Sequence, residues 1–178
     1  MKILFTGGGS GGHFYPILSV ANEIQKLAKE NRLLVPELYY VSDSPYNEGL
    51  LYDNNITYKM NAAGKRRMYF SINNPVDLFK TGWGILTAFW TVFSIYPDVV
   101  FSKGGYPSFP VVFAAHFFRI PIVIHESDSV PGRANKYAAK FATKIAVSFA
   151  EAANFFPSEK VAVTGNPVRE LITMPITD

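Results

Sequence analysis

The chain has 178 residues, of which 48% are hydrophobic and 17% are charged, and it contains no cysteine. This length is that of one ordinary domain, and the hydrophobic share excludes a disordered or collagen-like chain. The lack of cysteine excludes a disulfide framework, a thiol nucleophile and a cysteine-based metal site, and it fits a reducing compartment. The low charge and the 15% share of aromatic residues favour a surface partly buried against something other than water.

Positive charge is concentrated in the middle of the chain. The segment from Lys59 to Lys144 holds 11 of the 17 Lys and Arg residues but only 4 of the 14 Asp and Glu residues, so the remainder is acidic although the net charge is +3. A basic segment rich in aromatics predicts an anionic partner, which on these grounds is a phosphate group, a nucleic acid or an acidic membrane surface.

Short apolar runs alternate with helical patterns along the whole chain. In chain order they predict a strand at Lys2–Thr6, a helix at Tyr15–Glu30, strands at Glu37–Val41 and Ile56–Met60, a long helix at Pro75–Ser94 kinked near Gly82 and Gly84, a strand at Asp98–Phe101, a helix at Ser108–Phe118, a strand at Pro121–His125, a helix at Ala134–Phe141, and strands at Lys144–Val147 and Lys160–Thr164. This alternation predicts an α/β fold with a doubly wound parallel sheet over residues 1–164. Residues 165–178 are interpreted as the start of a linker.

No membrane-spanning helix is expected. The run without Asp, Glu, Lys or Arg from Thr81 to Pro97 has 17 residues and two glycines, whereas a spanning helix needs about 20 apolar residues. The apolar run after Met1 stops at glycine within a few residues, so no secretory signal is expected. These patterns predict a cytoplasmic chain whose long central helix is buried or interfacial.

A glycine loop, GGGSGG, lies between the first predicted strand and the first predicted helix. Glycine lets backbone amides approach an anion at a helix N-terminus, and doubly wound sheets bind ligands at this place. Gly7, Gly9 and Gly12 satisfy the letters of the dinucleotide fingerprint, but no carboxylate follows at the usual interval, and no GK[ST] marks a P-loop. The alternative is a tight turn that needs small residues only.

His13 ends this loop at the start of the helix. A helix N-terminus lowers the pKa of histidine, so a neutral imidazole beside a bound sugar hydroxyl could act as general base. The alternative is a histidine without a chemical role.

Two further polar loops follow predicted strands and lie on the same carboxyl edge of the sheet. Lys103–Ser108 forms a second glycine turn, and His125–Gly132 carries three titratable side chains, those of His125, Glu126 and Asp128. Such a group can orient hydroxyls or take part in proton transfer. The alternative is a polar loop that only caps the helix after Pro131.

Four segments in this order, GGGSGGHFYP, SKGGYPSFP, IPIVIHESDSVPGRANK and VAVTGNPVR, closely resemble the MurG family. These are UDP-N-acetylglucosamine:undecaprenyl-diphospho-muramoylpentapeptide N-acetylglucosaminyltransferases of peptidoglycan synthesis. The resemblance covers essentially the whole chain and implies the N-terminal, Rossmann-like half of an inverting GT-B glycosyltransferase. The chain has length for only this acceptor-binding domain, so the donor-binding domain is expected elsewhere and the isolated chain is expected to be inactive.

The resemblance also implies roles for individual residues. It places His13 and Glu126 in catalysis, the acceptor hydroxyl on C4 of N-acetylmuramate being the group that attacks the anomeric carbon of the donor. It places donor binding at Ser10, Gly11, Gly12, Asp128 and Arg169, and acceptor binding at His13, Gly104, Gly105, Tyr106, His125 and Glu126. Ser127 and Asp128 depart from the Gln and Asn usual in the family. A carboxylate at Asp128 would repel a diphosphate unless it binds a divalent cation or a sugar hydroxyl.

No DxD motif appears, so no metal and no cofactor is required, although Mg²⁺ could help through the substrate diphosphates. The expected partners are UDP-N-acetylglucosamine, the undecaprenyl-linked acceptor and an anionic membrane. Nucleic acid is not expected, because the basic residues lie beside aliphatic residues rather than regularly spaced aromatics. Two alternatives stay open: a membrane-recruiting subunit of a split transferase, and a non-catalytic nucleotide-binding Rossmann module.

Cations surround apolar residues at two places, as in peripheral proteins that meet an anionic leaflet. This pattern predicts a membrane-binding surface made by Lys65, Arg66, Arg67, Leu78, Phe79, Lys80, Trp83, Lys136 and Lys140. The resemblance implies that this surface meets the cytoplasmic face of the cell membrane. The alternative is that Leu78, Phe79 and Trp83 are core residues of the long helix.

Overall fold

Residues 1–8, 10–63 and 74–168 are described by the computed structural model of the chain, except for the side chains of residues 74–81. Its strands are β1 (Lys2–Thr6), β2 (Glu37–Ser42), β3 (Ile56–Met60), β4 (Val99–Ser102), β5 (Ile122–Glu126), β6 (Lys144–Val147) and β7 (Val161–Val163). Its helices are α1 (Gly11–Glu30), α2 (Glu48–Asp53), α3 (Asn74–Ile95), α4 (Ser108–Phe117), α5 (Arg133–Ala138) and α6 (Ala150–Ala153), with a short 3₁₀ helix at Ser158–Lys160.

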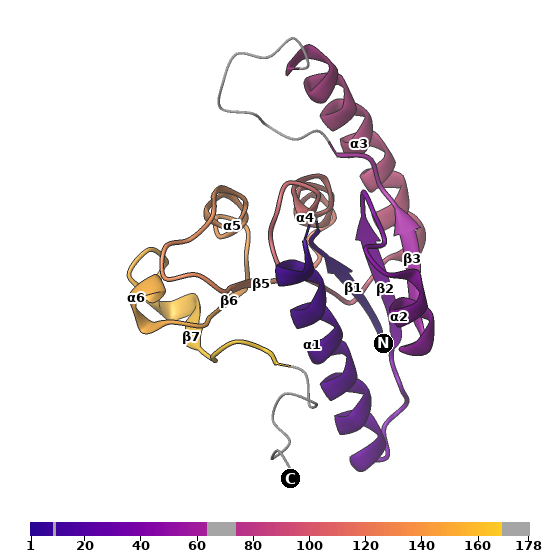
Figure 1. Cartoon of the computed structure of the whole chain (residues 1–178), viewed down its shortest axis with the longest axis vertical. Helices are drawn as coiled ribbons and strands as arrows, with labels where there is room; N and C mark the ends of the chain where they lie inside the picture. The colour runs from indigo at the N-terminus through magenta and orange to yellow at the C-terminus, as the bar shows by residue number, and fades with distance from the viewer. Residues whose placement is uncertain (9, 64–73, 169–178) are drawn as a thin grey trace, which may run out of the picture.

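The strands form one parallel sheet in the order β3-β2-β1-β4-β5-β6-β7 (Figure 1). This confirms the predicted doubly wound α/β fold. The order reverses at β1, whose Ile3 is in register with Leu38 of β2 and with Val99 of β4. In sheets of this kind ligands bind outside the carboxyl ends of the strands at the point of reversal. The loops that follow β1 and β4 are therefore the expected walls of a site.

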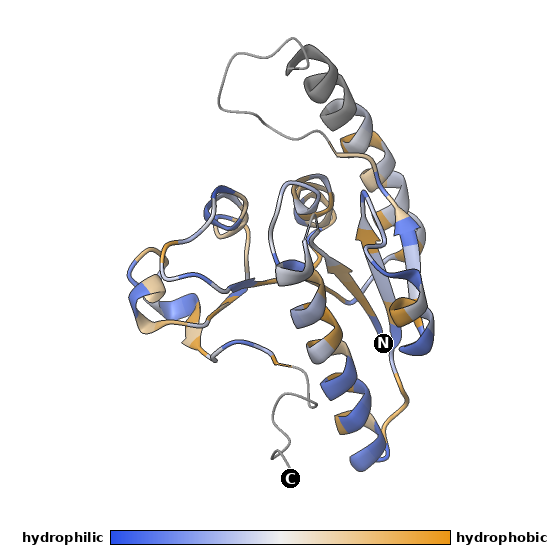
Figure 2. Ribbon diagram, viewed as in Figure 1, coloured by the Kyte–Doolittle hydropathy of each residue, from blue (hydrophilic) through white to orange (hydrophobic). Residues whose placement is uncertain are grey.

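Alternate residues of the strands enter two separate cores, because successive side chains of a strand point to opposite faces. Ile3 and Phe5 of β1 pack with α1 and α2, whereas Leu4 packs with the layer that contains α3 to α6. Figure 2 shows hydrophobic colours concentrated on the central strands, while the last turns of α1 are hydrophilic. The sheet is thus covered by helices on both faces.

Helix α1 begins at Gly11, four residues before the predicted start at Tyr15. The structure places Pro16 inside the helix and Ser10 at the N-cap. The difference matters, because it puts His13 in the first turn of α1.

The short helices α2 and α6 were not predicted. Each has a single buried residue, Leu51 in α2 and Ala152 in α6, so neither carries an apolar period that sequence analysis could detect. Helix α2 depends on a local cap instead, since the side chain of Asn47 accepts a hydrogen bond from the Leu50 amide at 2.9 Å.

Helix α3 is continuous through Gly82 and Gly84. At Gly84 the absence of a side chain lets the helix pack closely against the backbone just after β3. A Cβ atom on Gly84 would lie 1.8 Å from the carbonyl oxygen of Ala62. The buried side chain of Asn61 fastens the same contact by donating to the Gly84 carbonyl at 3.1 Å and accepting from the Thr87 hydroxyl at 2.9 Å.

We predict opposite effects for the same substitution at the two glycines of α3. Gly84→Ala should lower the free energy of unfolding by about 1–3 kcal/mol, because its methyl group has no room against the Ala62 backbone. Gly82→Ala should raise it by about 0.5–1 kcal/mol, because that glycine is exposed with open space around its Cβ position and alanine favours the helix. Urea unfolding measures both, and equal effects would contradict the packing described here.

Candidate active site

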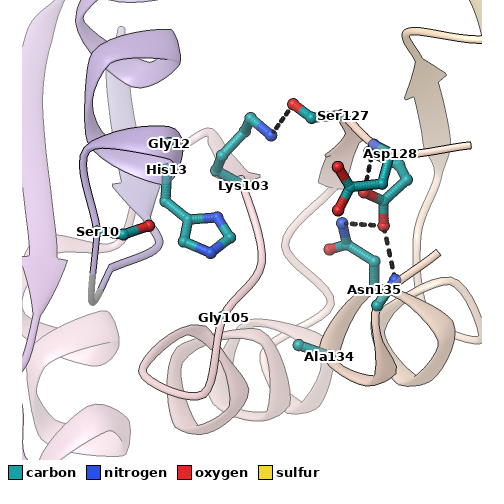
Figure 3. Close-up of a pocket in the computed structure, with 11 residues that line it drawn as sticks. Ser10, Gly12, His13, Lys103, Gly105, Ser127, Asp128, Ala134 and Asn135 are labelled. Carbon is teal, nitrogen blue, oxygen red and sulfur yellow. Dashed lines mark hydrogen bonds between the residues drawn. The ribbon is translucent and has the colours of Figure 1, made fainter. Parts of the chain in front are cut away.

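Three loops, after β1, β4 and β5, enclose a pocket of about 270 Å³ at the carboxyl edge of the sheet (Figure 3). Its lining residues are polar or small, and they come from parts of the chain far apart in sequence: Ser10, Gly12, His13, Lys103, Gly105, Glu126, Ser127, Asp128, Gly132, Ala134 and Asn135. The two glycine turns and the predicted titratable loop therefore do meet in one place.

The first wall is the N-terminal turn of α1. The amides of His13 and Phe14 bond to the Ser10 carbonyl, at 3.1 and 3.2 Å, and the first turn contains no acidic side chain. The positive end of this 20-residue helix is thus available to an anion. The buried Tyr40 of β2 fixes the start of the glycine loop, because its hydroxyl donates to the Gly7 carbonyl at 2.7 Å. Gly9 lies outside the described residues.

His13 is half-buried in this turn, and its ring faces the pocket (Figure 3). Burial lowers the pKa of His13, and the nearby ammonium of Lys103 lowers it further, against smaller opposing effects of the Lys103 backbone and of Glu126 and Asp128. The imidazole is therefore neutral at neutral pH. Its buried Nδ1 has no hydrogen-bond partner among the described residues. A neutral imidazole at this place can accept a proton from a ligand hydroxyl.

The second wall is the turn at Gly104 and Gly105. Their φ angles are +87° and +84°, in the left-handed region that favours glycine. A Cβ atom on Gly105 would lie 3.0 Å from the Gly8 carbonyl oxygen and 3.5 Å from Nε2 of His13. These glycines let the β4 loop come close to the β1 loop, so that Gly105 lines the pocket whereas Gly104 packs against Asn135.

Lys103 precedes this turn and was given no role by sequence analysis. Its side chain is only 2% exposed, lines the pocket, and donates from Nζ to the Ser127 hydroxyl. Burial lowers the pKa of Lys103, whereas the carboxylates of Glu126 and Asp128 raise it. The one available signal was its place, since a lysine directly after a buried strand and before two glycines is brought to the ligand-binding edge.

The third wall is shaped by Glu126, whose carboxylate is 4% exposed. One oxygen accepts from the Asp128 amide at 3.0 Å, and the other accepts from the Gly132 amide and the Asn135 side chain, each at 3.0 Å (Figure 3). Glu126 therefore fixes the loop between β5 and α5. Its predicted catalytic and acceptor-binding role stays a prediction, and the exposed Asp128 lines the rim of the pocket.

Other predicted site residues lie beside the pocket rather than in its lining. The Tyr106 hydroxyl donates to Asp43, which follows β2. His125 is buried against Phe101 and donates from Nε2 to the Gly165 carbonyl at 3.0 Å, and burial lowers its pKa. Gly11 packs near Tyr46. Arg169 lies outside the described residues.

Sequence analysis missed that the segment after β7 docks on this site. The hydroxyls of Ser127 and Ser148 both donate to the side-chain oxygen of Asn166, at 2.8 and 2.7 Å. Together with the bond from His125 to Gly165, these contacts fasten the predicted linker to the ends of β5 and β6. The described residues contain no group of three or more His, Cys, Asp or Glu side chains able to hold a metal ion.

A parallel sheet with two glycine turns and a helix N-terminus around one polar pocket, at the point where the strand order reverses, defines a Rossmann-like domain. Residues 3–147 match the Glycosyltransferase family 28 N-terminal domain, and the chain belongs to that family. This confirms that the chain is the N-terminal part of a glycosyltransferase, as the resemblance of the four sequence segments implied.

Curated relatives of the chain carry the name UDP-N-acetylglucosamine--N-acetylmuramyl-(pentapeptide) pyrophosphoryl-undecaprenol N-acetylglucosamine transferase. One from Bacillus thuringiensis (strain Al Hakam) is 43% identical over 170 residues, which are 95% of this chain and 46% of the relative. One from Clostridium novyi (strain NT) is 39% identical over 169 residues, again 95% and 46%. The chain spans about half the length of the curated relatives it matches.

Solved structures show the same relationship. The crystal structure of MurG from Acinetobacter baumannii matches with a TM-score of 0.71 and 26% identity, over 98% of this chain and 47% of that one. This fits the predicted half of a GT-B fold. A UDP-GlcNAc 2-epimerase from Neisseria meningitidis matches with a TM-score of 0.65 and 18% identity, over 94% of this chain and 47% of that one, and shows the fold alone.

We predict that Glu126→Gln destabilises the loop between β5 and α5. Both carboxylate oxygens accept from N–H groups, so either orientation of the amide sets an NH₂ group against a donor. The free energy of unfolding should fall by about 1–3 kcal/mol, and the Asp128 and Gly132 amides should lose protection from hydrogen exchange. The exposed Glu151→Gln is the matched control and should change stability by less than about 0.5 kcal/mol. Equal stability of both variants would remove Glu126 as the organiser of this loop.

Proposed function

We propose that this chain is the acceptor-binding half of an N-acetylglucosaminyltransferase of peptidoglycan synthesis. The enzyme would transfer N-acetylglucosamine from UDP-N-acetylglucosamine to undecaprenyl-diphospho-muramoylpentapeptide. The observation that carries the proposal is 43% identity, across 95% of the chain, to a protein named for this transfer. The pocket supports it, because three of the four sequence segments that resemble the MurG family supply its lining residues.

The chemistry follows from the neutral imidazole of His13 and the positive end of α1. The C4 hydroxyl of N-acetylmuramate attacks the anomeric carbon of the donor, and His13 takes the hydroxyl proton as the new C–O bond forms. The bond from the anomeric carbon to the diphosphate breaks, and UDP leaves with the electron pair. The positive end of α1 stabilises negative charge on the diphosphate.

A membrane surface is proposed on the outer side of α3. Large apolar side chains at helical spacing are exposed there, at 58% for Trp83, 65% for Leu86, 72% for Trp90 and 56% for Phe93. Exposed Phe117 of α4 packs beside α3, where its ring centroid lies 5.0 Å from that of Phe89. Several large apolar side chains exposed together mark an interaction site, and tryptophan favours the membrane interface.

Some predicted members of this surface can be placed and others cannot. The exposure of Trp83 contradicts the alternative that it is a core residue. Lys136 and Lys140 are exposed on and just after α5, and Lys136 lies over the Phe155 ring. Lys65, Arg66 and Arg67 lie outside the described residues, as do the side chains of Leu78, Phe79 and Lys80. Among the described helices, none is long and apolar enough to cross a membrane.

We predict that His13→Ala lowers kcat by roughly 100- to 10,000-fold, because general-base catalysis contributes this much. The measurement joins the chain to the donor domain of the Bacillus relative and follows N-acetylglucosamine transfer to a soluble analogue of the acceptor. His116→Ala is the matched control, because that histidine is exposed on α4, away from the pocket. An unaltered fusion that folds but transfers no sugar would contradict the proposed function, and a loss below tenfold would remove His13 as the base.

We also predict that replacing Trp83 and Trp90 together with Ala weakens binding to vesicles containing phosphatidylglycerol by at least about tenfold, because the buried apolar area is lost. Both side chains are exposed, so the fold should survive. Tyr52→Ala is the control, because Tyr52 is 84% exposed on α2, in the opposite helical layer. Equal vesicle binding by the double variant and the control would exclude this surface.

A further inference from the structure

The pocket contains a buried cation, Lys103, that has no part in the chemistry described above for the glycine loop and His13. Transfer of an ammonium from water into a protein interior is costly unless charge or hydrogen bonds compensate it. Lys103 is 2% exposed, and its described hydrogen bond goes to Ser127, a neutral hydroxyl. An ammonium has three N–H donors, and the described hydrogen bond uses one of them, on a side chain that lines the pocket. Figure 3 shows the Lys103 side chain reaching between His13 and Ser127.

The surrounding carboxylates differ in how far they are already engaged. Both oxygens of Glu126 accept hydrogen bonds from the β5–α5 loop and Asn135, so this charge is spread over three donors. Asp128 is exposed at the rim of the same pocket. An anionic ligand that entered beside α1 would be repelled by Asp128, and a cation within the pocket offsets that repulsion.

We propose that Lys103 is the cationic ligand of this pocket: its ammonium binds a phosphate oxygen of a diphosphate group and offsets the carboxylate of Asp128. This deepens the proposed function and rests on it, since the donor and the acceptor each carry a diphosphate. Ser127 holds the ammonium in place and is itself held by Asn166. A carboxylate at position 128 is then compatible with anion binding because Lys103 accompanies it.

His13 reports on these charges. The charged groups near it are Lys103 from the β4–α4 loop, Glu126 at the end of β5 and Asp128 from the β5–α5 loop. Removal of a nearby cation raises the pKa of a histidine, and removal of a nearby carboxylate lowers it. Lys103→Met and Asp128→Asn should therefore shift the pKa of His13 in opposite directions, which loss of a purely structural contact would not do.

The experiment titrates the chain with inorganic pyrophosphate and follows His13 by NMR across pH. Lys103→Met should weaken pyrophosphate binding by roughly tenfold or more, as expected for loss of a charged hydrogen bond, and it should raise the pKa of His13. Lys103→Arg should restore part of the affinity. Asp128→Asn, at an exposed position that leaves the fold intact, should tighten pyrophosphate binding and lower the pKa of His13. Lys140→Met, at an exposed lysine outside the pocket, is the control.

Ser127→Ala distinguishes a role of the Lys103 charge in binding from a role of its hydrogen bond to Ser127 in holding the loop. It breaks the bond from Lys103 to the β5–α5 loop but keeps the ammonium, so pyrophosphate affinity should fall clearly less than in Lys103→Met. A loss equal to that of Lys103→Met would overturn the proposal in favour of a structural lysine. Absence of pyrophosphate binding to the unaltered chain, or unchanged affinity and His13 pKa in Lys103→Met, would also overturn it. If Lys103→Met does not fold, the test falls to Asp128→Asn. Pyrophosphate binding that is no tighter in that variant, together with an unchanged His13 pKa, would then overturn the proposal. Failed sugar transfer with these Lys103 effects intact would count against the proposed function alone.

Discussion

The close approach of two glycine turns is the constraint on which the pocket depends. Gly105 lies so near the Gly8 carbonyl that a Cβ atom would be 3.0 Å from it, and its φ of +84° excludes most side chains. This contact joins the loops after β1 and β4, the two neighbouring strands between which the strand order of the sheet reverses. With bulkier residues the loops would separate, and His13 would no longer lie opposite the β5 loop. The geometry of the site is therefore set by backbone packing before any functional side chain is placed.

Burial of charge is the second theme of the site. The pocket holds a lysine and two carboxylates, and each buried member has a compensating partner: Lys103 has a hydroxyl and nearby carboxylates, and Glu126 has three N–H donors. Burial keeps His13 neutral, so proton acceptance is available at neutral pH. The same groups that shape the loop thus also set the electrostatic environment of a ligand, because interactions between charges are stronger where water is excluded.

Two features at the edges of the domain connect the pocket to its surroundings. The segment after β7 is fastened to the site by Asn166 through Ser127, so a shift of that segment would reach the hydroxyl that holds Lys103. Helix α3 is apolar on both sides, with Ala88 and Val92 in the core and tryptophans outside. One face of α3 stabilises the fold, and the other is available to a surface less polar than water.

The sequence by itself determined the strands, the doubly wound fold and the family, because buried parallel strands appear as short apolar runs and because the family's motifs are continuous segments. It also predicted that His13 and the loop after β5 would share an edge. Only the tertiary structure decided which side chains face the pocket. In the folded chain His125 is buried outside the pocket lining, the Tyr106 hydroxyl donates to Asp43, and Lys103 donates to Ser127. These contacts join residues from different loops. Local periodicity carries no information about them, since they depend on how the strands are ordered and how closely the loops pack.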